Sequence, residues 1–272
     1  MTQSQRPDHV PQQRTRGEGE SAHKRGCYVY GIFPGDVRVD SDFTGVGEPP
    51  AGIKAVRDGN LAAVISRVEL DRPLGTPDDL RAHKRLLDSS VTEVPVLPMR
   101  FGAVLSDEAA VVTELLRANR DEFAAALREI DGRVQYVVKG RYLEPAVLAA
   151  VLSENRQAQQ LRQEIKGADP ALTRDASIRL GEVISDAIEA KRAEDTRLLG
   201  ERMDGHCVAS AIRAPSHELD AVHVAFLVEH GRENELEQVI DGLAADWDGR
   251  VDLRVLGPMA AYDFVVTSAP RG

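Results

Sequence analysis

Residues 222–255 read VHVAFLVEHGRENELEQVIDGLAADWDGRVDLRV, and their pattern changes from strand to helix and back to strand. Apolar side chains occupy every second position over 222–228 and alternate with charged residues over 251–255. Because successive strand side chains point to opposite faces, this period predicts two strands with one buried face each. Apolar residues between Leu236 and Trp247 recur at helical spacing. The segment therefore predicts an α+β fold in which a helix covers a sheet.

The N-terminal half contains strand and helix patterns of its own. The apolar run Cys27–Phe33 predicts a strand, and Asp58-Gly59 between two apolar runs predicts a hairpin, since a tight turn needs the positive φ that glycine adopts. A helix is predicted to begin at Thr76, because Thr-Pro-Asp-Asp supplies a cap, an early proline and two carboxylates at the positive end of the helix dipole.

The chain between this helix and residue 142 predicts three further elements. Two prolines interrupt the apolar stretch 94–105, which therefore predicts an edge or irregular strand. A second helix is predicted over 106–131, with its apolar residues on one face. Val134, Tyr136 and Val138 alternate with polar residues, which indicates a strand with one buried face.

A charged helical segment follows at 144–203, and Pro170 divides it into arms at 145–167 and 171–203. We expect the arms to form a helix pair that projects in part as a coiled-coil hairpin. Short strands are then predicted at Cys207–Arg213 and at Tyr262–Val266.

The predicted fold class is α+β, with two domains whose small antiparallel sheets have a ferredoxin-like arrangement, each covered on one face by helices, plus the coiled-coil hairpin. We expect a disordered tail at 1–26 and an N-terminal α+β domain at 27–145. The C-terminal domain is expected at 146–272, with the helical hairpin at 146–204 and an α+β part at 205–272.

Charge and composition exclude several classes of protein. The 272 residues include 34 Lys and Arg against 44 Asp and Glu, a net charge of -10, which argues against a nucleic-acid partner. We expect no membrane partner and no secretory signal, because the sequence lacks a long apolar stretch and an apolar run after its N-terminal basic residues. Two widely separated cysteines do not form a disulfide framework, so a cytoplasmic location is expected.

No motif of a known catalytic chemistry is present in the sequence. Gly45-Val-Gly47 lacks the third glycine of a dinucleotide-binding loop, and the pattern H-E-x-x-H does not occur. We therefore expect no catalytic residue, no metal site and no cofactor. The alternatives are an enzyme on a ferredoxin-like scaffold that uses His83 or His223, or a small-molecule-binding or ligand-sensing module. Both histidines can also be explained without catalysis, His83 as a residue at the edge of the core that bonds a backbone carbonyl and His223 as a solvated or half-buried side chain.

Several motifs, in order along residues 27–266, resemble the gas vesicle protein L/F family (GvpL/GvpF). The most specific of them is PVLPMRFG at 95–102. The motifs are YVYGI (28–32), HKRLL (83–87), VPVLPMRFG (94–102), KGRY (139–142), RLGE (179–182) and GPMAAYDF (257–264).

The resemblance implies a non-enzymatic structural or accessory protein, located at gas vesicles in the cytoplasm. It implies contacts with the major shell protein and with other gas vesicle accessory proteins during assembly. It also implies two α+β domains with a helical coiled-coil element.

A partner-binding site can be predicted within the stretch 94–105. Shell subunits are very apolar, and a partner can shield such a subunit with a sheet edge, an apolar groove or both. The prolines of this stretch prevent self-pairing, its apolar side chains offer contacts and its arginine can bind a carboxylate. The predicted contact residues are Met99, Arg100, Phe101, Val104 and Leu105. The alternative is that these side chains fill the N-terminal core.

The hairpin 145–203 is the second candidate surface. Its mixed charge is either a solvated face or a pattern of interspersed signs that selects a partner.

Overall fold

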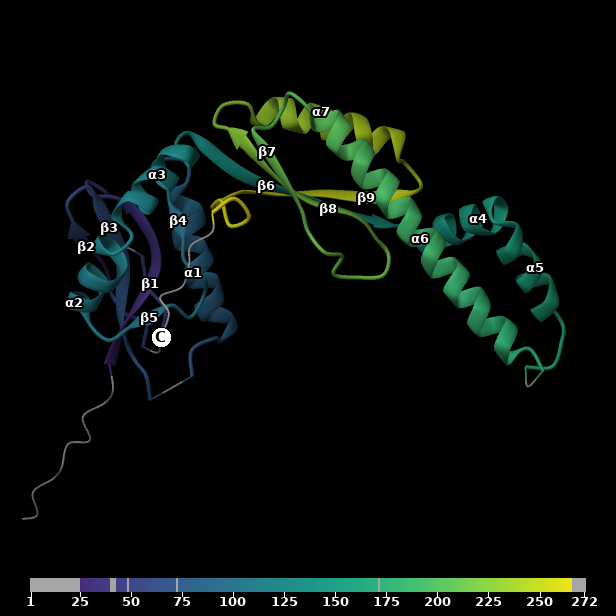
Figure 1. Cartoon of the computed structure of the whole chain (residues 1–272), viewed down its shortest axis with the longest axis horizontal. Coiled ribbons are helices and arrows are strands. Elements are labelled where there is room, and N and C mark those ends of the chain that lie inside the picture. Colours follow the sequence, from purple (N-terminus) through teal and green to yellow (C-terminus); the bar gives the residue numbers. More distant parts are fainter. Residues whose placement is uncertain (1–24, 40–42, 48, 72, 171, 266–272) are drawn as a thin grey trace, which may run out of the picture.

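The computed structural model describes residues 25–39, 43–47, 49–71, 73–170 and 172–265. The predicted tail lies outside the described residues, except for Arg25 and Gly26, which begin the first strand. Figure 1 shows an N-terminal unit of strands and helices, a second such unit, and a helical arm that projects from the second unit. Two small antiparallel sheets with helices confirm the α+β class.

The first sheet has the strand order β2-β3-β1-β4, and β5 also pairs with β1. Its strands are β1 (Arg25–Pro34), β2 (Ile53–Asp58), β3 (Leu61–Glu69), β4 (Leu97–Pro98) and β5 (Val104–Leu105). The predicted hairpin is confirmed: Gly59 between β2 and β3 has a φ of 62°. The proline-containing stretch 94–105 supplies only the two-residue strands β4 and β5, as the prediction of an irregular strand requires.

Helices cover both faces of the first sheet, whereas the sequence predicted one covered face. Tyr28 and Tyr30 of β1 pack in one apolar cluster with α1, while Cys27 and Val29 pack in another with η1 and α3. Consecutive residues of β1 are buried, so both faces of the strand need cover. The helices are α1 (Pro77–Ser90), α2 (Glu108–Ala110), η1 (Val111–Arg117) and α3 (Arg120–Ile130). The predicted cap at Thr76 is confirmed, and its side chain accepts a hydrogen bond from the Asp79 N–H.

The second sheet has the order β7-β8-β6-β9, and its strands are antiparallel. The strands are β6 (Arg133–Tyr142), β7 (Ala209–Ile212), β8 (Asp220–Glu229) and β9 (Val251–Met259). The predicted boundary at residue 145 assigned β6 to the N-terminal domain, but β6 pairs with β8 and β9 and so belongs to the second sheet. Alternation identifies a strand but does not identify its partner strands, which lie at least 78 positions further along.

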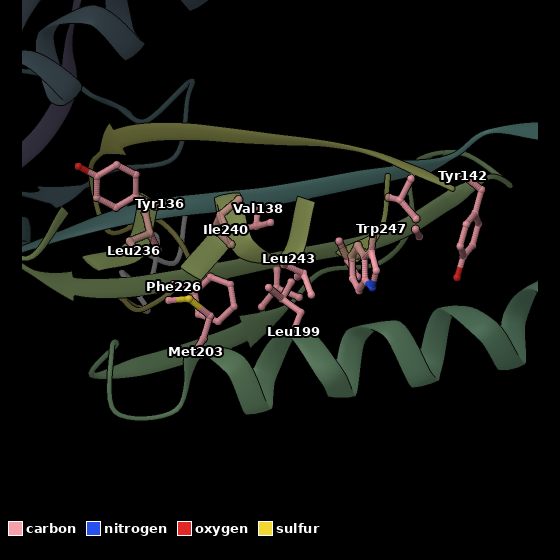
Figure 2. Close-up of a cluster of buried hydrophobic side chains, with 14 of the residues drawn as sticks. Tyr136, Val138, Tyr142, Leu199, Met203, Phe226, Leu236, Ile240, Leu243 and Trp247 are labelled. Atoms are coloured by element: carbon pink, nitrogen blue, oxygen red, sulfur yellow. The ribbon is translucent and has the colours of Figure 1, made fainter. Parts of the chain in front are cut away.

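The core of the second unit lies between this sheet and two helices, α6 (Arg174–Met203) and α7 (Glu233–Asp246) (Figure 2). Leu199 and Met203 of α6 and Leu236 of α7 are fully buried against Phe226 of β8. Trp247, directly after α7, is 3% exposed. Burying a large apolar side chain contributes roughly 1.5–3 kcal/mol, so this layer is the main stabilising element of the unit.

The helical arm differs from a simple helix pair. Its first half is broken at Asn155 into α4 (Glu144–Glu154) and α5 (Arg156–Ile165), and both lie beside α6 (Figure 1). The Asn155 side chain accepts hydrogen bonds from the N–H groups of Gln157 and Ala158, which caps α5 and explains the break. The second half is the single 30-residue helix α6.

The strand predicted at 262–266 is wrong for the residues that the structure describes, because residues 262–264 form a turn beyond the end of β9; Val266 lies outside the described residues. Asp263 accepts two hydrogen bonds from Arg213, at 2.9 and 2.6 Å, and one from Gln135 at 2.5 Å. The Ala260 N–H donates to Asp88 of α1 at 3.1 Å, and Tyr262 packs in the α1 side of the first core. Residues 260–264, called the C-terminal latch below, therefore bind the two units to each other.

Candidate functional site

The five predicted contact residues separate into different environments. Met99 is 2% exposed and lies in the core that α3 covers. The Phe101 ring is half-buried, 5.7 Å from the ring of Tyr28, and Val104 and Leu105 are half-buried in opposite clusters of the first sheet. Only Arg100 is exposed. Most of this stretch thus serves the N-terminal core, the alternative that the sequence left open.

The two histidines of the enzyme alternative have structural contacts. His83 is 5% exposed, and its Nδ1 lies 2.8 Å from the Tyr28 hydroxyl. Burial lowers the pKa of His83 to about 4, so the ring is neutral at neutral pH. The Nδ1 of His223 lies 3.1 Å from the Ala214 carbonyl oxygen. Within the described ranges, no three His, Cys or carboxylate side chains lie close enough together to hold a metal ion.

A groove of about 680 Å³ lies between α6 and the strand β7. Its floor includes Val222 and Val224 of β8, which are at most 2% exposed. The α6 wall includes three small residues at a helical spacing of three and four, namely Ala193, Thr196 and Gly200, and it also carries the charged residues Glu189, Arg192 and Arg197. Ile212 of β7 also lines the groove and is 75% exposed, although a β-branched apolar residue is usually buried. The groove is therefore open to solvent and partly apolar.

The strand β7 forms one side of this groove and is an edge of its sheet. In the described part of the chain it pairs with β8 alone, so its second edge presents N–H and C=O groups without a strand partner. The groove thus combines a sheet edge with apolar side chains, which are the two features that bind an extended segment.

The loop at the end of the groove is held rigidly by Asp220, which is 1% exposed. Its carboxylate accepts hydrogen bonds from the N–H groups of Ser216 and His217, at 2.7 and 2.9 Å. Burial alone would raise the pKa of Asp220, but the Ser216 hydrogen bonds and the charges of Lys139 and Arg141 hold it below its ordinary value. The loop is therefore preorganised, and its shape does not have to form on binding.

Arg192 of α6 joins this loop to the helix. Its guanidinium donates to the carbonyl oxygens of Asp220 and Glu218, at 2.7 and 2.6 Å. Arg192 also lines a second cavity of about 660 Å³, which extends along α6 to Gly181. The two cavities share Glu189, Arg192 and Pro215, so one side of α6 is hollowed over much of its length. The sequence indicated this helix as a surface, but the position of β7 beside it depends on the tertiary structure.

Solved structures of gas vesicle proteins share this fold. The crystal structure of GvpF from Anabaena sp. PCC7120 superposes with a TM-score of 0.74, at 22% identity, over 89% of this chain and 99% of that one. GvpF from Microcystis aeruginosa gives a TM-score of 0.72 at 18% identity, over 88% of this chain and 98% of its own. The two-sheet architecture is thus shared with these two crystal structures.

Sequence comparison defines the family. Gas vesicle protein F of Streptomyces sp. (strain CB03234) is 32% identical over 242 residues, which are 88% of this chain and 98% of the relative. Gas vesicle protein L of the same strain is 28% identical in an alignment of 267 residues that covers 87% of this chain and 91% of the relative. The profile described as "Gas vesicle synthesis protein GvpL/GvpF" matches residues 26–266. The chain belongs to the GvpL/GvpF family, as the motif order predicted.

Among the described helices, none is both long enough and apolar enough to cross a membrane.

Proposed function

We propose that this protein is a non-enzymatic accessory protein that binds the major gas vesicle shell protein, together with other accessory proteins, during vesicle assembly in the cytoplasm. Membership of the family supports the role in gas vesicles. The observation that carries the binding role is the open groove between α6 and β7, where an exposed Ile212 stands beside an unpaired sheet edge.

An apolar shell subunit is prone to aggregate before it is assembled, because its exposed strands pair with any free edge. In the proposed complex, an extended segment of that subunit pairs with β7 and places apolar side chains over Val222, Val224 and Ile212. The small residues of α6 leave room for those side chains. Release follows when pairing between shell subunits replaces pairing with β7.

The groove can be blocked at Gly200, where an added Cβ atom meets no atom within 4 Å. Gly200→Phe is expected to fill the groove and to abolish capture of purified shell protein in a pull-down. Gly242→Phe is the matched control, because Gly242 is an exposed glycine of α7 with equally open surroundings and lies outside the groove. Undiminished capture by a folded Gly200→Phe variant would exclude the groove as the binding site.

Arg100 remains a proposed second contact, since it alone of the predicted residues is exposed. Its guanidinium can bind a carboxylate of a partner. Arg100→Glu should weaken capture without unfolding the protein, whereas a change at Met99 should unfold it, because Met99 is buried. Equal capture by Arg100→Glu and the unaltered protein would remove this contact.

We propose a ferredoxin-like classification for the second unit, with α4, α5 and α6 as an enlarged first crossover. The sequence of elements from β6 to β9 is strand, helices, two strands, helix and strand, which is the arrangement of that fold. The proposed domain boundary is Asp131-Gly132, directly before β6, in place of residue 145.

A further inference from the structure

The outer edge of β9 carries a self-complementary sequence. Residues 251–255 read VDLRV, with an acid and a base placed symmetrically about Leu253 and a valine at each end. Among the described residues, β9 pairs with β6 and with no other strand. Val255 and Leu256 are 37% and 49% exposed along this edge. A strand of nine residues is long for one whose outer edge pairs with no strand among the described residues.

The register between β9 and β6 shows on which face of the sheet the apolar and the charged side chains of residues 251–255 lie. Val255 lies opposite Val138 and Leu253 opposite Gly140, on the face that α6 and α7 cover. Asp252 lies opposite Arg141 and Arg254 opposite Lys139, on the other face. Within residues 251–255, the charged and the apolar side chains therefore lie on different faces of the sheet.

Arg254 has an unfavourable neighbour on one side. Like charges directly opposite each other on neighbouring strands repel, and Lys139, whose ammonium group lies 3.7 Å from the Asp220 carboxylate, is the residue opposite Arg254. Arg254 forms an ion pair with Asp252, at 2.9 Å along the same strand, and its side chain is 74% exposed. A carboxylate beyond the free edge would compensate the repulsion.

We propose that β9 pairs with β9 of a second copy of this chain, antiparallel and centred on Leu253, which joins the two four-stranded sheets into one. In this register Asp252 lies opposite the partner subunit's Arg254, and Val251 lies opposite the partner subunit's Val255. The twofold symmetry produces each contact twice. The charged pairs lie on the uncovered face and the valine pairs on the helix-covered face.

Charge complementarity selects this register over its neighbours. Centring the pair on residue 252 places Asp252 opposite its own copy, and centring it on residue 254 places Arg254 opposite its own copy. Both arrangements bring like charges together. A register centred between residues would place a charged side chain opposite an apolar one of the other face. Of the registers centred on residues 252, 253 and 254, only the one centred on Leu253 places opposite charges together.

This interface is independent of the proposed shell contact. The strand order β7-β8-β6-β9 places the groove and the β9 edge at opposite edges of the sheet, so a dimer leaves both grooves open.

The test is the molar mass of the purified full chain by light scattering over a range of concentrations. The unaltered protein is expected to approach twice the mass of one chain as concentration rises. Asp252→Arg alone and Arg254→Asp alone are each expected to remain at the mass of one chain, because like charges then face each other across the axis. An equimolar mixture of the two variants is expected to recover the doubled mass, since each copy supplies the charges that the other lacks.

The double variant D252R/R254D is expected to dimerise as the unaltered protein does, and Asp246→Arg, an exposed change on α7, is the control that should leave the dimer intact. Circular dichroism verifies that each variant is folded. A single-chain mass for the unaltered protein at every concentration would overturn the proposal. So would dimers of undiminished stability in both single variants, or a mixture that stays monomeric.

Discussion

Acid is expected to destabilise this protein through His83 in a pH range where carboxylates contribute little. The ring is 5% exposed and burial lowers its pKa from 6.5 to about 4. The unfolded chain therefore binds a proton that the folded chain excludes. The stability that the neutral ring contributes is fully present above pH 6.5 and is lost as the pH falls toward 4.

The size of the effect follows from the two pKa values. One pKa unit corresponds to about 1.4 kcal/mol, so the full loss is roughly 3 kcal/mol, of which about 2 kcal/mol is lost by pH 5. That is a considerable part of the stability of a typical domain, which is about 5–15 kcal/mol. Carboxylates with ordinary pKa values near 4 titrate mainly below this range.

Urea unfolding at pH 7 and at pH 5 measures this loss, and His83→Phe is the informative variant. The variant is expected to be less stable at pH 7 by about 1–3 kcal/mol, because the buried Tyr28 hydroxyl loses its side-chain partner and keeps only the 3.4 Å contact with the Gly102 N–H. It should nevertheless lose much less stability than the unaltered protein between the two pH values. His230→Phe is the control, since His230 is half-exposed and the variant keeps His83. An identical pH 7 to pH 5 loss in His83→Phe and the unaltered protein would refute the reasoning.

Three further outcomes are expected from the packing. Gly200→Ala should raise the free energy of unfolding by about 0.5–1 kcal/mol, because the added methyl group meets no atom within 4 Å in the folded protein and reduces the conformational freedom of the unfolded chain. A melting temperature below that of the unaltered protein would contradict this prediction. Asp195→Ala should lower that free energy by about 1–3 kcal/mol in urea unfolding, because the buried Tyr142 hydroxyl loses its acceptor at 2.6 Å, whereas the Arg250 side chain, now bound at 2.7 and 2.9 Å, is 37% exposed and stays hydrated; an unchanged free energy would contradict the role of Asp195. Asp263→Ala should free the C-terminal latch and speed amide exchange at Ala260, and unchanged exchange would show that apolar packing alone holds it.

Local patterns in the chain were sufficient for most elements. The Thr76 cap, the Asp58-Gly59 hairpin and the strand-helix-strand pattern of residues 222–255 all form as predicted. Each depends on neighbours within a few positions, because caps, turns and side-chain periodicity are local properties. The order of the family motifs likewise predicted the family, since it is a property of the linear sequence.

Long-range packing decided the rest. The pattern of β6 could not reveal that its partners are β8 and β9, and the apolar character of Met99 could not reveal whether it meets a partner or the core. The groove exists because β7 lies beside α6. The local sequence does not predict the path of the loop between the end of α6 and the start of β7, so it does not predict this position of the strand. The packing of distant segments against one another decides which apolar surfaces remain exposed. The periodicity within one segment carries no information about that packing.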